Sequence, residues 1–240
     1  MATRLYSDLA RYYDLIYHWK PYAREAGRLH EILAREGVAD GADLCDVACG
    51  TGSHIAELAR WYRVRGRDLN AGMVEEARRK LPDVSLSVAD MAETPLSPPA
   101  DAMLCLFSAI GYVYPEERLV RAVHNFAAGL APGGVLIVEP WVEAAVFQPG
   151  TPMLQTHETA DLKLCRALVT RRDGDFAVLE FHWLVAGAGE PRVRHEVEEH
   201  RLWLVPHDHL IELLEGAGLS TRVEPDALNT DRPLLVARRD

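Results

Sequence analysis

The sequence predicts an α/β protein: a mostly parallel sheet of about seven strands with helices on both faces, and an antiparallel insertion near residues 160–205. Three observations support this fold class. Short apolar segments alternate with amphipathic ones between residues 43 and 139. A glycine-rich turn directly follows the first of them. After residue 149 the segments become longer and are separated by turn signals, with no helix between them.

The first half of the chain has the pattern of βαβ units. A helix is expected at 22–36, where Leu29 and Leu33 share one face. Residues 101–107 are almost wholly apolar, as in a central parallel strand covered on both faces. Ala131-Pro132-Gly133-Gly134 predicts a turn before the fifth strand. The other core elements are expected as strands at 43–48, 62–69, 84–88 and 135–139, and helices at 53–60, 71–80 and 116–129.

The second half predicts about three long antiparallel strands, at 162–170, 176–186 and 193–205. The segment Arg172-Asp173-Gly174-Asp175 is a hairpin signal between the first two. A helix at 207–216 and strands at 219–224 and 233–238 close the chain. We therefore expect a single domain over 1–240, divided into an N-terminal helical cap (1–36), a core (37–150), the insertion (151–206) and a C-terminal helix with closing strands (207–240).

Composition excludes several classes of function. The chain has 240 residues, 48% of them hydrophobic, and a formal net charge of −10. No basic cluster is long enough to follow a phosphate backbone, so we expect neither nucleic acid nor an anionic membrane as partner. The four cysteines form no C-x-x-C pair, and a helix start explains His207-Asp208-His209 better than a metal site. With no apolar signal segment, the sequence predicts a cytoplasmic protein without a metal.

The turn after the first strand is the most informative segment. The strand ends in Asp46, and Gly50 and Gly52 follow before a helix begins. Glycines there let the backbone turn tightly and let a ligand approach the unpaired N–H groups of the helix start. A dinucleotide site needs G-x-G-x-x-G, which is absent because Ala48 replaces a first glycine and no third one follows. An NAD dehydrogenase is therefore improbable, and the acid favours a cationic ligand.

The order Asp46-x-x-x-Gly50-x-Gly52 resembles the first motif of class I S-adenosylmethionine (SAM) methyltransferases, with Ala48 as a departure. The resemblance implies a Rossmann-like sheet, SAM as the cofactor, and S-adenosylhomocysteine as the product formed from it. Asp68, at the end of the second strand, is expected to accept hydrogen bonds from the ribose hydroxyls, and Asp90 is expected to accept one from the adenine amine. The alternatives are a helix cap and an ordinary loop acid. The predicted cofactor-binding residues are Asp46, Ala48, Gly50, Thr51, Gly52, Asp68, Leu69, Met73, Asp90, Met91 and Phe107.

Other segments are similar to a narrower group, the bacterial N,N-dimethyltransferases that act on nucleotide-linked 3-amino sugars of the desosamine and mycaminose type. The segments are Tyr13-Asp14-x-x-Tyr17, Cys105-Leu-Phe-Ser-Ala-Ile-Gly-Tyr112, Leu130-Ala-Pro-Gly-Gly134, Val138-Glu-Pro-Trp141 and Glu180-Phe-His-Trp-Leu-Val-Ala186. This resemblance runs through most of the chain. It implies a homodimer, with substrate held between the core, the N-terminal segment and the inserted strands.

One departure concerns the acceptor. Those enzymes have a histidine after Ser-x-Ile-Gly, where this chain has Tyr112. A tyrosine of ordinary pKa is a poor base at neutral pH, but N-methylation relies largely on orienting a free amine. We expect Tyr112 to align the amine through its hydroxyl. Tyr13 and Tyr17, four residues apart on one helical face, are expected to cap the active site and contact the SAM carboxylate or the acceptor. Alternatively, Tyr112 indicates a different acceptor, and the other two rings only pack on the core.

Five residues are expected to contact the acceptor: Ser108, Glu139, Trp141, His182 and Trp183. Ser108 follows the fourth strand. Glu139 and Trp141 end the fifth strand, where a carboxylate suits a cationic amine and an indole suits a base or sugar; a buried acid and a packing ring are the alternatives. His182 and Trp183 point to opposite faces of their strand, so at most one of them faces a pocket.

The sequence therefore predicts a SAM-dependent methyltransferase with a small-molecule acceptor, and N-methylation of a nucleotide-linked deoxyamino sugar is the leading hypothesis. A diphosphate would need cations from the insertion, for which Arg166, Arg171, Arg192 and Arg194 are candidates. One alternative is another small-molecule N- or O-methyltransferase, acting on a glycine-like amine or a secondary metabolite. A SAM-binding regulatory module without turnover is the alternative from a different class.

Overall fold

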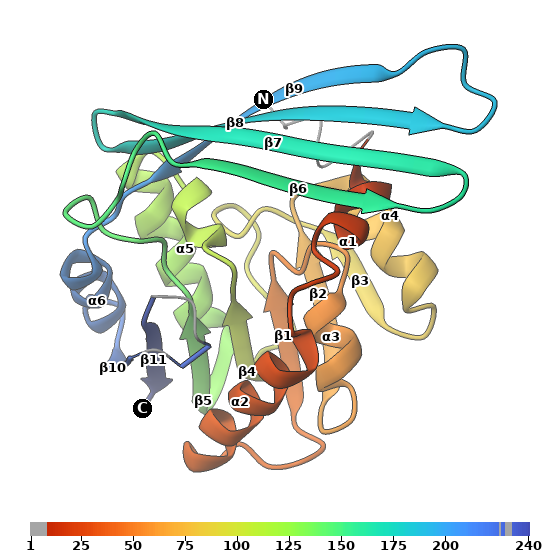
Figure 1. The fold of residues 1–240 in the computed structure, drawn as a ribbon. Coiled ribbons are helices and arrows are strands. Elements are labelled where there is room, and N and C mark those ends of the chain that lie inside the picture. Colours follow the sequence, from red (N-terminus) through yellow and green to blue (C-terminus); the bar gives the residue numbers. More distant parts are fainter. Residues whose placement is uncertain (1–8, 226, 229–231) are drawn as a thin grey trace.

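Seven strands form the central sheet of the computed structural model, which describes residues 9–225, 227–228 and 232–240. The first eight residues of the expected N-terminal cap lie outside these ranges. The strand order is β10-β11-β5-β4-β1-β2-β3 (Figure 1). Strands β1 to β5 run parallel, and β11 is antiparallel to both β5 and β10. The strands are β1 (Asp43–Val47), β2 (Arg63–Asp68), β3 (Ser85–Val88), β4 (Ala100–Cys105), β5 (Leu130–Val138), β10 (Leu219–Glu224) and β11 (Leu234–Arg239).

Helices cover both faces of this sheet. They are α1 (Tyr13–Ile16), α2 (Tyr22–Arg35), α3 (Ser53–Leu58), α4 (Ala71–Lys80), α5 (Glu116–Gly129) and α6 (His207–Gly216), with short 3₁₀ turns η2 (Ala10–Tyr12) and η3 (Ala109–Tyr112). Leu44 and Leu104 pack with α2 on one face, while Cys45 and Met103 pack with α5 and α6 on the other. Neighbouring residues of a strand are thus both buried, which is why these strands read as continuous apolar runs. No helix within the described ranges is long and apolar enough to cross a membrane.

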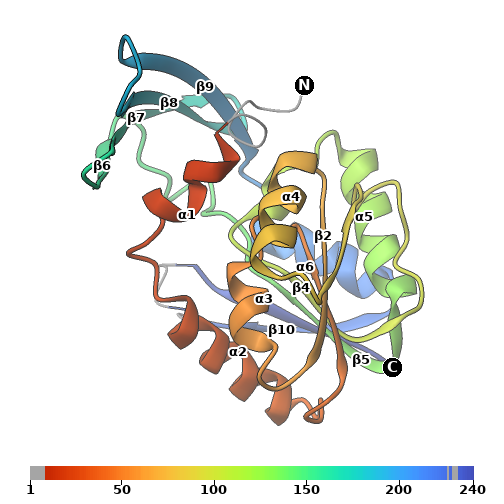
Figure 2. The ribbon, with the colours of Figure 1, turned by 90° about the vertical axis from the view of Figure 1, so that its right-hand side faces the viewer.

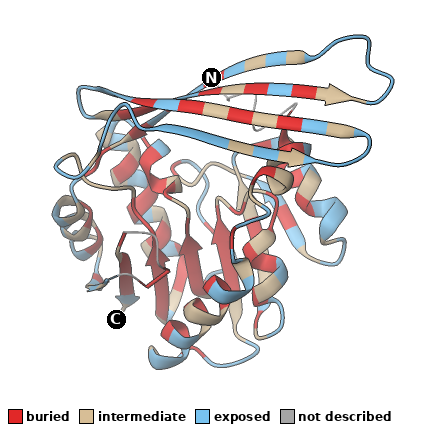
Figure 3. Cartoon of the chain, viewed as in Figure 1, coloured by how far each residue is buried: buried red, intermediate tan, exposed pale blue. Residues whose placement is uncertain are grey.

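A second, antiparallel sheet lies across the carboxyl ends of the parallel strands, and α1 lies between this sheet and the core (Figures 1 and 2). Its strands are β6 (Pro152–Glu158), β7 (Leu162–Asp173), β8 (Phe176–Gly187) and β9 (Arg194–Trp203), in that order. Along β7 and β8, buried residues alternate with more exposed ones (Figure 3). The buried side chains, among them Leu168 and Trp183, pack against Leu9 and Ile16 of the N-terminal segment.

The structure confirms the predicted fold class and corrects two details. The insertion has four strands rather than about three, because β6 is a largely exposed edge strand with no apolar alternation to reveal it. The fifth core strand begins at Leu130 instead of residue 135. The expected turn at residues 131–134 belongs to the strand, whose pairing with β4 shifts register between Ala100 and Ala102.

Candidate active site

A cavity of about 590 Å³ opens where the carboxyl ends of β1, β2, β3 and β4 meet. This volume is within the range of about 300–1,000 Å³ that is usual for small-molecule sites. Twelve predicted site residues line it: Tyr13, Asp46, Ala48, Gly50, Thr51, Asp68, Leu69, Met73, Asp90, Met91, Phe107 and Tyr112. Seven others do not: Tyr17, Gly52, Ser108, Glu139, Trp141, His182 and Trp183. The predicted cofactor set thus converges on one cavity, and most of the predicted acceptor set lies outside its wall.

The glycine turn has left-handed backbone at three positions, with φ of 76° at Ala48, 56° at Gly50 and 77° at Gly52. A Cβ on Gly50 would meet nothing within 4 Å and would occupy space at the cavity wall, whereas one on Gly52 would come within 2.8 Å of Leu81. Gly50 therefore keeps room for a ligand, and Gly52 allows packing. Ala48 adopts a conformation that favours glycine, which explains why glycine is usual at this place in the motif.

Asp68 fixes the glycine turn to the end of β2. Its Oδ2 accepts the backbone N–H of Gly50 at 2.8 Å, and its Oδ1 accepts that of Asn70 at 2.8 Å. The cap of α4 is Asn70, whose side chain accepts the N–H groups of Gly72 and Met73. Asp68 is therefore not the helix cap that the sequence left as its alternative role. Its pKa is raised by burial, despite the two backbone hydrogen bonds.

Asp46 is a buried acid, and one of its carboxylate oxygens accepts no hydrogen bond from a described residue. It is 2% exposed, and its Oδ1 has no hydrogen-bond partner among the described residues. Burial raises its pKa from the usual 3.8 to about 7; neighbouring Asp68 adds to the shift and His54 opposes it. A buried carboxylate without a partner is destabilising unless a donor or a cation meets it. A carboxylate at this point of the cavity therefore fits a ligand that carries a positive charge, such as SAM.

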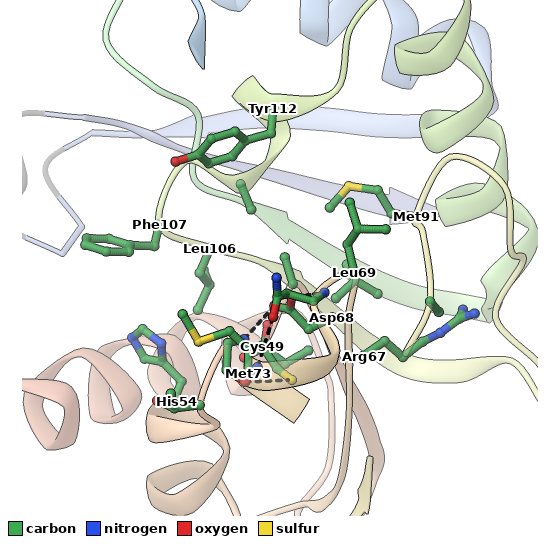
Figure 4. A pocket seen from close by; sticks show the side chains of 18 of the residues that line it. Cys49, His54, Arg67, Asp68, Leu69, Met73, Met91, Leu106, Phe107 and Tyr112 are labelled. Carbon is green, nitrogen blue, oxygen red and sulfur yellow. Dashed lines mark hydrogen bonds between the residues drawn. The ribbon is translucent and has the colours of Figure 1, made fainter. Parts of the chain in front are cut away.

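The side of the cavity beyond Asp68 combines apolar and charged side chains. Figure 4 shows Leu69 and Met91 on the same side of the cavity as Arg67. Asp90, at the end of this wall, accepts the N–H of Ala92 at 2.8 Å and pairs with Arg118 at 2.7 Å. Its carboxylate is thus held in one orientation by two donors, while each oxygen keeps further acceptor capacity.

A buried ionic cluster at the other side of the cavity was not predicted from the sequence. Lys20 pairs with Glu25 at 2.5 Å, and the second oxygen of Glu25 lies 2.7 Å from His54. Burial acts to raise the pKa of Glu25, but hydrogen bonds from His54 and Lys20 outweigh it and lower the pKa. The Lys20 ammonium also lies 4.7 Å from the centre of the Phe107 ring. No motif signals this cluster, because only the fold brings the N-terminal segment beside α3.

The turn after β4 is strained and firmly held. Phe107 and Ser108, neither of them glycine, have φ of 54° and 62°. The fully buried Glu139 accepts the N–H of Phe107 at 2.7 Å and pairs with Arg232 at 2.6 Å. Arg232 also donates to the Ser108 hydroxyl at 2.6 Å, and its guanidinium lies 5.3 Å from the Trp141 ring. The carboxylate of Glu139 thus supports this turn from behind the cavity wall.

Three tyrosines were expected to surround the acceptor. The rings of Tyr13 and Tyr17 lie 4.6 Å apart, and Tyr17 contacts Phe107 edge-on at 5.3 Å, one layer behind the cavity wall. Burial raises the pKa of Tyr13 well above its usual value, so it is protonated at neutral pH and can donate a hydrogen bond but not act as a base. The Tyr112 hydroxyl lies 2.7 Å from Nδ1 of His200, a residue of β9 that sequence reasoning missed.

His182 and Trp183 point to opposite faces of β8, as strand alternation predicts. Trp183 is completely buried beside the guanidinium of Arg166, at 5.2 Å. His182 lies on the outer face, where it contacts Glu180 at 2.9 Å and His195 at 3.1 Å. Neither side chain lines the cavity.

Comparisons with known proteins agree with this geometry. Residues 44–134 match a family described as methyltransferase domains. The dTDP-3-amino-3,6-dideoxy-alpha-D-glucopyranose N,N-dimethyltransferase of Streptomyces fradiae is 36% identical over 91% of this chain and 86% of its own length. The crystal structure of DesVI from Streptomyces venezuelae has a TM-score of 0.88 and 31% identity, covering 97% of this chain and 99% of DesVI. SAM-bound CalS10, an amino pentose methyltransferase from Micromonospora echinaspora, has a TM-score of 0.80 and 31% identity, covering 92% of both chains.

Gly50→Val should weaken SAM binding by more than tenfold, about 1.4 kcal/mol, because the added side chain fills ligand space. Gly37→Val is the matched control: Gly37 also has left-handed backbone and open space around its Cβ position, but it lies outside the cavity wall. We expect both variants to lose stability and only Gly50→Val to lose affinity, as measured by calorimetric titration. Unchanged affinity in Gly50→Val would refute the placement of the ligand.

SAM affinity should rise with pH through about 7. Below this pH Asp46 is mostly protonated and neutral; above it, the carboxylate attracts the cationic ligand. If only the anion binds, affinity increases about tenfold between pH 6 and pH 8. The raised pKa also means that the stability contributed by Asp46 to the ligand-free protein is complete below pH 4 and is lost as pH rises through about 7. Calorimetry across this range tests the first effect, and Asp46→Asn should abolish it; equal pH dependence in the variant would contradict the assignment.

Proposed function

The chain belongs to the family of SAM-dependent methyltransferases that includes the dTDP-amino-sugar N,N-dimethyltransferases, and on this basis we propose that it methylates the amino group of a nucleotide-linked deoxyamino sugar. The observation that carries the proposal is the cavity itself. It joins the buried Asp46 and the glycine turn at one end to Phe107 and Tyr112 at the other, beneath the antiparallel sheet.

The cofactor is proposed to occupy the half of the cavity between the glycine turn and Met91. Asp46 would meet its positive charge, Asp68 its ribose and Asp90 its adenine amine. Lys20 supplies a cation that could pair with its carboxylate. The chemistry that SAM supplies when bound is a methyl group, which the amine nitrogen takes by direct displacement as the S–C bond breaks and its electron pair stays on sulfur.

The chain's own residues would orient the amine rather than deprotonate it. Tyr13 keeps its proton at neutral pH, and His200, the imidazole next to Tyr112, has its pKa lowered to about 4 by burial and by the charge of Arg166. Neither Tyr13 nor His200 is therefore a suitable base for an ammonium group at neutral pH. The proposed mechanism needs none, because a neutral amine arrives with its lone pair available and the ammonium product releases its proton to water.

Arg166 supports a negatively charged acceptor. It is 2% exposed, lies 4.6 Å from the Tyr17 ring centre, and donates to Gln155. Its Nη1 has no hydrogen-bond partner, and it makes no ion pair with a residue that the structure describes. A buried cation that none of the described residues neutralises favours an anion nearby. We propose that its field favours the diphosphate of a nucleotide sugar on the adjacent side of the cavity.

Arg166→Met should raise the KM for the nucleotide sugar about tenfold, because it removes this charge and keeps an apolar side chain between the rings. Arg171→Met is the control: Arg171 lies on the exposed face of the same strand and pairs with Glu199. Steady-state kinetics measures the KM, and SAM affinity and thermal unfolding measured alongside show whether a change in KM comes from the lost charge or from a loss of folded protein. A KM change of the same size in both variants, or none in Arg166→Met, would count against the diphosphate.

Mass spectrometry of reactions with SAM and a dTDP-3-amino sugar tests the proposed reaction. One or two added methyl groups, with an equal amount of S-adenosylhomocysteine per methyl, are the expected products. Bound SAM that yields no methylated sugar would reject this acceptor class and favour another small molecule, and the same assay with glycine-like amines would then identify it.

We further propose that the protein acts as a homodimer in the cytoplasm, without a nucleic-acid or membrane partner. The outer face of the antiparallel sheet supports the dimer, because it exposes Val169, Leu184 and Val197, which are 45–53% accessible. The four cysteines, all free, support a reducing compartment. Light scattering should give twice the mass of one 26.8 kDa chain, and a monomer at micromolar concentration would refute the dimer.

A further inference from the structure

A tyrosine and a histidine from distant parts of the chain form a pair at the acceptor end of the cavity. Tyr112 is the last residue of η3, and His200 lies on the inward face of β9. The Tyr112 hydroxyl and Nδ1 of His200 are 2.7 Å apart, a short hydrogen bond. A Cβ at Gly111 would lie 3.5 Å from Leu202, so η3 and β9 are in contact beside the pair. Figure 4 shows Tyr112 across the cavity from Met73 and His54, so its ring faces the space where an acceptor would lie.

The surroundings of His200 keep its imidazole neutral and fixed. It is 2% exposed, and the Phe181 ring contacts it edge-on at 4.9 Å. Its pKa is lowered to about 4 by burial and by the neighbouring Arg166, so it carries no charge at neutral pH. A neutral imidazole has one N–H nitrogen and one acceptor nitrogen. The role of the pair therefore depends on whether Nδ1, the nitrogen that faces Tyr112, carries the proton.

The two possible arrangements have opposite consequences for an amine. If Nδ1 carried the proton, it would donate to the phenolic oxygen, and the hydroxyl would donate onward to the amine lone pair, blocking the nucleophile. If Nδ1 accepts, the Tyr112 O–H donates its hydrogen bond to His200, and a lone pair of the phenolic oxygen can accept a hydrogen bond from an amine N–H. The second arrangement leaves the amine lone pair directed away from Tyr112 and available for the methyl group.

We propose that His200 is a positioning residue: its Nδ1 accepts the Tyr112 hydroxyl hydrogen bond, so that the Tyr112 oxygen receives an N–H of the acceptor amine and aims the amine lone pair. This role rests on the proposed amine acceptor. This arrangement also explains how a tyrosine can orient the amine from position 112, because the Tyr112 hydroxyl proton is bound to His200 by a hydrogen bond and does not reach the amine lone pair.

Kinetics of a double-mutant cycle tests the pair with SAM and the amino sugar. Tyr112→Phe and His200→Leu should each lower kcat about tenfold, and the double variant should be no slower than Tyr112→Phe, because both changes remove one shared function. His200→Asn should keep most of kcat, since its amide oxygen can replace Nδ1 as acceptor. SAM affinity should change less than twofold throughout. His195→Leu is the control, because His195 lies on the opposite face of β9 and should leave kcat unchanged.

Independent losses that multiply in the double variant, or a His200→Asn variant as slow as His200→Leu, would overturn the proposal and assign His200 a packing role. Nitrogen NMR of histidine-labelled protein gives a readout that needs no acceptor: a proton on Nε2 of His200 is expected, and a proton on Nδ1 would overturn the pair. If the wild-type enzyme binds SAM but methylates no amino sugar, the proposed function fails, while the tautomer still decides how the pair is arranged.

Discussion

Two carboxylates that accept backbone N–H groups, the half-buried Asp68 and the fully buried Glu139, hold the turns on which the cavity is built. Asp68 ties Gly50 of the glycine turn to the start of α4, and Glu139 ties Phe107 of the strained turn after β4 to the core. Both turns contain left-handed, non-glycine residues, which persist only when surrounding contacts compensate for their strain. The hydrogen bonds that these backbone N–H groups donate to the carboxylates supply such contacts, so the shape of both turns depends on them.

The two sheets form different parts of the proposed site. The ends of β1, β2 and β3 in the parallel sheet form the proposed cofactor half, and inward-facing side chains of the antiparallel sheet, such as Arg166 and His200, lie beside the proposed acceptor half. The N-terminal segment joins them: Asp14 accepts from Thr51 and pairs with Lys80 at 2.5 Å.

Most residues of the predicted cofactor set line one cavity because they are contiguous in the chain or follow strand ends. The motif around Asp46 and the acid at Asp68 belong to single βα units, whose geometry is fixed. The acceptor half depends on contacts between residues far apart in the chain, such as Tyr112 with His200, which no local pattern reveals. Glu139 illustrates the limit: its place after β5 was predicted, but its enclosure by Arg232 arises only in the folded chain. The fourth inserted strand was missed because an exposed edge needs no apolar alternation.

The proposed function places the acceptor amine in the cavity between the cofactor and Tyr112. A crystal structure with S-adenosylhomocysteine and a dTDP-3-amino sugar measures this directly. We expect the sugar nitrogen within hydrogen-bonding distance of the Tyr112 hydroxyl, the sulfur on the glycine-turn side, and the diphosphate toward Arg166. A sugar bound elsewhere on the molecule, or one whose nitrogen points away from the sulfur, would contradict it.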